Sequence, residues 1–149
     1  MKTRRFLVVV MMLFASAAPV WAVDHTAFID LQKKLAARGD AQAQSALGFI
    51  YFQGEVVPQD YAEALKWFRL AAAQGDALAQ HNLGLMYAKG YGVPQNHIEA
   101  HTWFTLAAAS YTSKPNRDRA VAARDTEAAR MTPAQIAEAQ KLAREWKKQ

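Results

Sequence analysis

Two histidines have a spacing that could bind a metal. His97 and His101 are four residues apart, which places both on one face of a helix. Glu99 lies off that face, so the string does not form an HExxH motif, and His81 and His25 come from other parts of the sequence. Because two ligands do not close a metal site, we predict a structural or surface role for the histidines and no metal or cofactor.

Side chains with catalytic potential are few and lie in no known motif. Glu63 and Glu99 are expected on the solvent side of their helices, which suits a helix surface better than a general acid–base pair. Ser45 and Ser110 belong to no nucleophile motif, and the sequence holds no glycine-rich phosphate loop. It also lacks cysteine, which excludes thiolate metal sites, disulfides and a lipoprotein anchor. We therefore predict that the protein is not an enzyme.

The elements that position these residues come from an internal repeat. Residues 39–74 and 75–110 align without a gap, and 20 of the 36 positions are identical. A fixed period of this length is typical of stacked helical repeats. The sequence shows no strand pattern, so we predict an all-α solenoid built from helical hairpins.

Each repeat is predicted to contain two helices. In the first repeat, Asp40 caps a helix that ends at Gly54, and Asp60 caps a second helix that Gly75 closes. The buried stripes are predicted to be Ala43, Leu47, Ile50 and Tyr51 on the first helix and Ala64, Trp67, Phe68, Ala71 and Ala72 on the second. Glycine inside a helix is unfavourable, so Gly48 and its equivalent Gly84 predict a close approach by another backbone.

The two ends of a solenoid need caps. In residues 23–38 we predict a capping helix, Thr26–Arg38, that covers the first repeat with Phe28, Leu31 and Leu35. Residues 111–149 are predicted to form a degenerate third repeat or a C-terminal cap, with a loop over 110–116 and a helix over 117–130. A last helix starts at Thr132, where Gln135 can complete a capping box, and its apolar stripe is Ile136, Ala139, Ala143 and Trp146.

Residues 1–22 have the layout of a secretory signal peptide. A basic start precedes the apolar run Phe6–Ala18, whose 13 residues are fewer than the ~20 that span a bilayer. Cleavage after Ala22 removes three of the 18 basic residues, which leaves 15 against 13 acidic residues and lowers the formal charge from +5 to +2. We predict a periplasmic or secreted protein with no stable membrane anchor after signal cleavage and no nucleic-acid partner.

The repeated motif resembles the Sel1-like repeat, a relative of the tetratricopeptide repeat. The shared residues include Leu-Gly-x-x-Tyr-x-x-Gly, then Val-Pro-Gln, then Ala-x-x-Trp-Phe-x-x-Ala-Ala, over residues 39–110. Val56 departs from the pattern, since the second repeat has Gly92 there, so the first connector is predicted to take a different path. The resemblance implies a right-handed α–α solenoid with a concave face and a role as an adaptor in the bacterial envelope.

The residues that change between repeats mark a candidate binding surface. A stripe opposite the buried face of each first helix differs at every position, and its exposed apolar members would form a groove for a protein or peptide. The stripe contains Gln42, Ser45, Phe49 and Phe52 in the first repeat and Leu78, His81, Leu85 and Ala88 in the second. The alternative is that these side chains pack against neighbouring helices, with Phe49 under the N-terminal cap.

These features predict an exported adaptor or scaffold, as a monomer, that binds a protein or peptide partner through its concave face. Two alternatives stay open. The first is an envelope enzyme, or its regulatory subunit, that acts on cell-wall or saccharide substrates. The second is a structural scaffold that self-assembles, because stacked repeats can also associate end to end.

Overall fold

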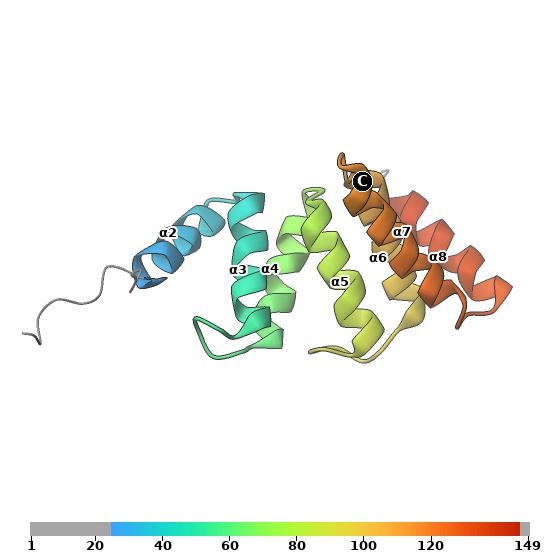
Figure 1. Ribbon diagram of the computed structural model, residues 1–149, viewed down its shortest axis with the longest axis horizontal. Helices are drawn as coiled ribbons and strands as arrows, with labels where there is room; N and C mark the ends of the chain where they lie inside the picture. Colours follow the sequence, from blue (N-terminus) through green and yellow to red (C-terminus); the bar gives the residue numbers. More distant parts are fainter. Residues whose placement is uncertain (1–24, 147–149) are drawn as a thin grey trace, which may run out of the picture.

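The computed structural model describes residues 25–146, and in that range the chain forms seven helices and no strand. Helices α3 to α6 stand in a row, with α2 at one end and α7 and α8 at the other (Figure 1). The predicted all-α solenoid is confirmed. The helices are α2 His25–Ala37, α3 Ala41–Gln53, α4 Tyr61–Ala73, α5 Ala77–Lys89, α6 His97–Ser110, α7 Lys114–Ala128 and α8 Pro133–Trp146.

The predicted signal peptide, residues 1–22, lies outside the described residues and stays a prediction. None of the helices between residues 25 and 146 is long and apolar enough to cross a membrane.

Side-chain caps start the repeat helices where the sequence predicts them. The Asp40 carboxylate accepts a hydrogen bond from the Ala43 amide at 2.7 Å, and the Asp60 carboxylate accepts from the Glu63 amide at 3.0 Å. Gly54 ends α3 in the left-handed conformation, with φ of 70°. The caps therefore set both ends of α3 and the start of α4 by local chemistry alone.

A phenylalanine ring, and not a backbone, approaches each helical glycine. A Cβ added to Gly48 would lie 2.5 Å from Phe68 Cδ1, and one added to Gly84 would lie 2.7 Å from Phe104 Cδ1. Phe68 is fully buried and Phe104 is 3% exposed. The predicted close approach at these glycines is thus confirmed, but the group that approaches is a side chain and not a backbone. The phenylalanine ring of the second helix in each hairpin packs directly on the first helix.

Glutamine side chains join successive units. Gln44 donates from Nε2 to the carbonyl oxygen of Ala36 at 3.1 Å, and the equivalent Gln80 donates to Ala72 at 3.3 Å. Gln74 adds hydrogen bonds to the Gly39 carbonyl oxygen and to Gln44 Oε1. Because the last carbonyls of a helix lack intrahelical partners, these amides fix each helix relative to the one before it.

The two connectors take different paths, as the Val56 departure predicts. Gly92 has a φ of 68°, whereas no non-glycine residue in residues 25–146 has a positive φ, so Val56 does not reproduce that conformation. The second connector also packs against the first repeat: the Tyr91 ring stacks on Tyr61 at 4.9 Å, and Phe52 lies 5.8 Å from Tyr91. An aromatic cluster therefore joins the units at the end where the connectors lie.

The N-terminal helix covers the first repeat with a different face from the predicted one. Ile29 and Ala36 are its buried residues, Leu35 is partly buried, and Phe28 and Leu31 are 51% and 52% exposed. The helix has apolar residues on two faces, and its main packing partner is α3. The face with Ile29 and Ala36 meets Ala43 and Leu47 of α3, and the hydrogen bond from Gln44 to the Ala36 carbonyl oxygen lies on this same face.

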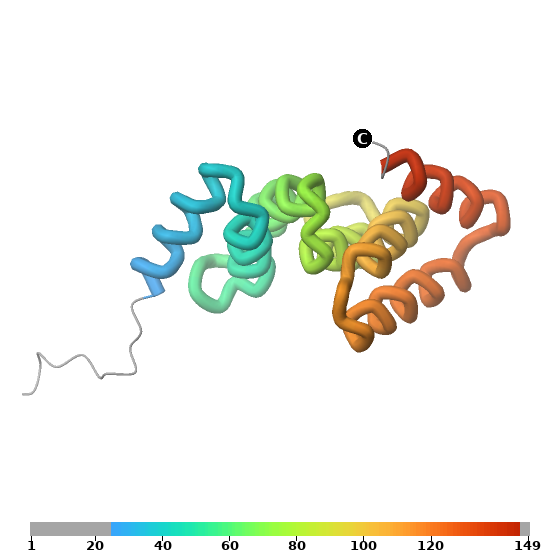
Figure 2. Tube along the Cα trace, turned by 90° about the horizontal axis from the view of Figure 1, so that it is seen from above, coloured from blue at the N-terminus to red at the C-terminus, as the bar shows by residue number. Residues whose placement is uncertain are grey.

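The C-terminal segment corrects the predicted loop and departs from the hairpin pattern. Helix α6 runs to Ser110 and α7 starts at Lys114, because Pro115 fits the first turn of a helix and does not prevent it. The predicted capping box is confirmed, since Gln135 N donates to Thr132 Oγ1 at 3.3 Å and Thr132 N donates to Gln135 Oε1 at 2.8 Å. Helices α7 and α8 each pack mainly against α6 and splay apart from each other (Figure 2).

Candidate binding surface

The predicted stripe separates into an exposed part and a packed part. Gln42, Phe49 and Leu78 lie on the surface, and the two apolar side chains are 44% and 48% exposed. Phe49 is thus not covered by the N-terminal helix. Large apolar side chains at this level of exposure are available to a partner. The exposed part of the candidate surface is therefore Gln42 and Phe49 on α3 and Leu78 on α5.

The other members of the stripe pack inside the protein. Ser45 is 3% exposed, and Phe52 belongs to the aromatic cluster, with its ring 5.4 Å from that of Tyr61. His81 lies with its ring 5.2 Å from Phe104, and Leu85 packs against the small cluster that contains Phe104. The α5 side chains of His81 and Leu85 thus pack against Phe104 of α6, and Phe52 lies away from them at the connector end.

The reason for this burial is the position of the first helices in the stack. Helix α3 contacts α2, α4 and α5, and α5 contacts α3, α4 and α6. A helix with neighbours on several sides buries residues that a single amphipathic stripe would leave exposed. The sequence predicts only the face toward the helix's own hairpin partner.

The two histidines with metal-ligand spacing point to different surroundings. His97 Nδ1 lies 2.6 Å from Glu127 Oε2, and this carboxylate, 5% exposed, also accepts from Arg130 at 3.3 Å. His101 is 3% exposed and faces a cavity instead. Within the described part of the chain, no three side chains of the metal-ligating types come together as a site. The His97–Glu127 pair instead fixes α7 onto α6.

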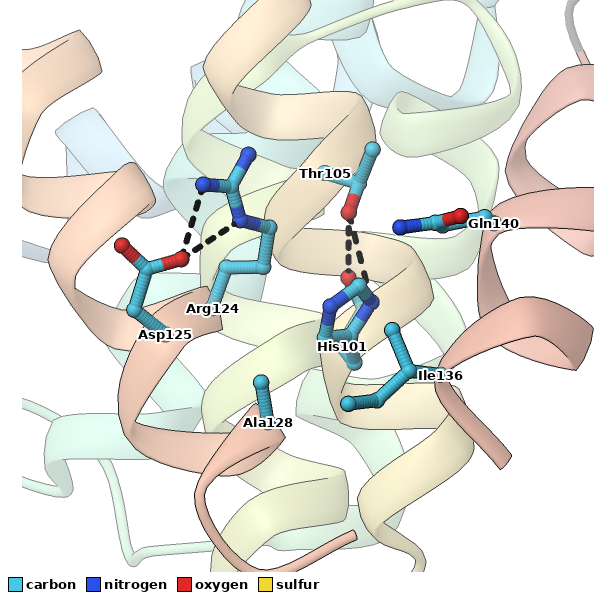
Figure 3. Close-up of a pocket in the computed structure, with 7 residues that line it drawn as sticks. All are labelled: His101, Thr105, Arg124, Asp125, Ala128, Ile136 and Gln140. Atoms are coloured by element: carbon cyan, nitrogen blue, oxygen red, sulfur yellow. Dashed lines mark hydrogen bonds and ion pairs between the residues drawn. The ribbon is translucent and has the colours of Figure 1, made fainter. Parts of the chain in front are cut away.

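A cavity of about 320 Å³ lies where α7 and α8 splay apart over α6. Its walls carry His101 and Thr105 from α6, Arg124 and Asp125 from α7, and Gln140 from α8 (Figure 3). Arg124 is bonded to Asp125 at 2.7 and 2.9 Å. The Thr105 hydroxyl donates to the His101 carbonyl oxygen at 2.8 Å and lies 3.5 Å from His101 Nδ1. Because that proton is already donated to a carbonyl, the two residues do not form a nucleophile–base pair.

The buried histidines predict that the fold loses stability in mild acid. Burial lowers the pKa of His101 below its ordinary 6.5, and Arg124 lowers this pKa further, against the opposite effect of Asp125 and Glu127. Burial, with Arg119, also lowers the pKa of His81. Below pH 6.5 the unfolded chain therefore binds more protons than the folded chain, and the free energy of unfolding falls as pH falls.

We expect the urea midpoint to be lower at pH 5.5 than at pH 7.5. Ordinary carboxylates are ionised at both pH values, so their protonation does not cause the difference. A His101→Gln variant should show a smaller difference between the two midpoints. A midpoint that is equal or higher at pH 5.5 in the unmodified protein would contradict the burial of these rings.

The stack of helical hairpins in residues 25–146 is the architecture of a helical-repeat protein. Residues 41–76 and 77–110 each match the Sel1 repeat. The chain contains two Sel1 repeats, and the resemblance of its repeated motif to this family is confirmed. Sel1 repeats are commonly protein-interaction scaffolds, and their fold is typically not enzymatic.

Two solved structures share this fold. One is c5321, a protective antigen present in uropathogenic Escherichia coli strains that displays an SLR fold, with 30% identity and a TM-score of 0.73 over 79% of this chain and 24% of that one. The other is a Sel1 repeat protein from Oxalobacter formigenes, with 28% identity and a TM-score of 0.54 over 77% of this chain and 52% of that one. This chain thus spans about a quarter and about half of their lengths. No curated protein matches the sequence.

Proposed function

We propose that this protein is an exported adaptor of the bacterial envelope that binds a protein or peptide on the face formed by α3 and α5. Export rests on the basic start and apolar run of residues 1–22. The observation that carries the binding face is the exposure of Phe49 and Leu78 on helices whose other apolar stripe members are packed. Two large apolar side chains left in solvent on a rigid scaffold are typical of anchors for a partner.

The face can be tested with the double variant Phe49→Ser, Leu78→Ser. We expect its unfolding midpoint to stay near that of the unmodified protein, because changes at exposed sites away from caps and cores alter stability by about 0.5 kcal/mol or less. Partner capture should fall at least tenfold, since apolar anchors at an interface contribute about 2 kcal/mol or more each. The measurement is site-specific photo-crosslinking from residues 49 and 78 in intact cells of the source organism.

Leu70 supplies the matched control. It is 45% exposed and lies on α4, the second helix of the first hairpin. Leu70→Ser should keep the crosslinks, and a photo-crosslinker at residue 70 should give none of the same products. If Leu70→Ser abolishes capture as strongly as the double variant does, the partner does not select the face of α3 and α5.

Export has a separate test. Fractionation of cells that express the full chain should place it outside the cytoplasm with its first 22 residues removed. A full-length product in the cytoplasm would overturn the envelope location and leave the binding face untouched.

A further inference from the structure

In the first repeat, a lysine of the chain itself occupies a site made by a glutamate and a tryptophan. Lys66 Nζ lies 3.2 and 3.3 Å from the two carboxylate oxygens of Glu63 and 4.9 Å from the centre of the Trp67 ring. Trp67 Nε1 donates to the same carboxylate at 3.1 Å. The carboxylate and the ring face both favour a cation, so the three groups form one ammonium-binding arrangement on the outer face of α4.

The second repeat keeps the glutamate and the tryptophan and loses the lysine. Glu99 and Trp103 stand 36 residues after Glu63 and Trp67, but the position of Lys66 is taken by Thr102. The Thr102 hydroxyl is buried and lies 3.3 Å from the Ala139 carbonyl oxygen of α8, so this position now serves helix packing. The Glu99 side chain has no ion-pair or hydrogen-bond partner within residues 25–146.

The indole of Trp103 has also lost its acceptor. Trp103 is 8% exposed, and its buried Nε1 has no hydrogen-bond partner in the described range. Its ring packs edge to face on Trp146 of α8, with the centres 4.9 Å apart and the planes at 68°. Buried donors without an acceptor are rare, and the first repeat shows that the acceptor here would be the glutamate four residues before.

A cavity of about 190 Å³ opens at this place, between α6 and α8. Glu99, Trp103, Trp146 and Glu145 contribute to its walls. Among the described residues, Glu145 has only a loose surface contact with Lys141, at 3.9 Å, which leaves its carboxylate open to another cation. Two carboxylates and two indoles therefore surround a space that no cation of residues 25–146 fills.

We infer that this cavity, the Trp103–Trp146 pocket, binds the ammonium group of a lysine side chain that belongs to a partner protein. The ammonium takes the place that Lys66 occupies in the first repeat, against the Glu99 carboxylate and the face of an indole. Glu99 then accepts from Trp103 Nε1 as Glu63 accepts from Trp67, and Glu145 closes the site from α8. The inference goes beyond the proposed α3–α5 face, because it adds a second contact and names a chemical group on the partner, and it rests on the proposed function only in taking that partner to be a protein.

The test is an NMR titration of the ¹⁵N-labelled protein with Nα-acetyl-lysine methylamide, followed at the indole Nε1–H signals. The Trp103→Phe variant assigns the Trp103 signal. We expect the lysine probe to shift the Trp103 and Trp146 signals. Nα-acetyl-norleucine methylamide, which lacks the ammonium group, should bind at least tenfold more weakly. Glu99→Gln should weaken binding of the lysine probe about tenfold, because a charge-assisted hydrogen bond becomes a neutral one.

Two further variants keep the result interpretable. Lys66→Met removes the internal cation, and the change it causes in the Trp67 signal gives the signature of an ammonium leaving such a site. Glu145→Gln tests the second wall if Glu99→Gln alters the fold. Equal shifts with lysine and norleucine probes, no shift with lysine, or full binding by both glutamine variants would overturn the inference. The Phe49→Ser, Leu78→Ser variant should bind the lysine probe normally, so failure at either surface is distinguishable from failure at the other.

Discussion

Replacing Phe68 with alanine should lower the free energy of unfolding by about 3–5 kcal/mol. The ring is fully buried, it covers Gly48, and it lies 6.5 Å from the ring of Phe52 in the aromatic cluster. Its removal loses the transfer free energy of the ring and leaves a cavity between α3 and α4, where the backbones are held by caps and cannot close the gap. Urea denaturation followed by circular dichroism measures the change.

Phe28→Ala is the matched control, since it makes the same change on a ring that is 51% exposed. We expect it to cost less than about 1 kcal/mol, because an exposed ring loses little contact with the interior. The sequence predicts Phe28 as a capping residue of the first repeat, and that prediction would require a loss close to that of Phe68→Ala. A large effect of Phe28→Ala would therefore contradict the placement of α2.

Much of this fold follows from local signals that act within a few residues. Asp40, Asp60 and Asn96 start helices through hydrogen bonds from amides two or three residues ahead, and Gly54 ends one through its left-handed conformation. These interactions need no tertiary context, so the sequence predicts them. The 36-residue period adds the hairpin plan, because identical units stack in the same way.

The rest depends on which elements meet in space. Ser45 and His81 are packed because helices of the neighbouring units lie against their own helices. The hydrophobic periodicity of a single helix does not predict these contacts. The face of α2 that packs on α3 is the one with Ile29 and Ala36, and the Ala36 carbonyl oxygen there also accepts a hydrogen bond from Gln44, eight residues later on the next helix. The Trp103–Trp146 pocket exists because α8 packs on α6 beside α7 and not on α7 itself. Each case is decided by long-range packing between helices of similar amphipathic pattern.

The glycines inside the first helices supply the second large effect. Gly48→Ala would improve helix propensity by up to about 1 kcal/mol in an isolated helix. In the protein, the new methyl group would lie 2.5–2.9 Å from Phe68 Cδ1, Cε1 and Cγ, all below van der Waals contact. The ring is fully buried and cannot rotate away without displacing its neighbours. We expect a net loss of about 2 kcal/mol, within the range for an overpacked core.

A double-mutant cycle separates this clash from any other effect of the alanine. In a Phe68→Leu background the branched side chain leaves room beside residue 48, so Gly48→Ala should cost at least about 1 kcal/mol less there than in the unmodified protein. Gly84→Ala tests the same arrangement at Phe104, where the shortest distance is 2.7 Å, and should act in the same direction. If Gly48→Ala stabilises the protein, the gain in helix propensity exceeds the cost of the clash, and the Phe68 ring does not pack on the glycine. If its cost is the same in both backgrounds, the loss arises elsewhere, and the glycine has another role than to admit the ring.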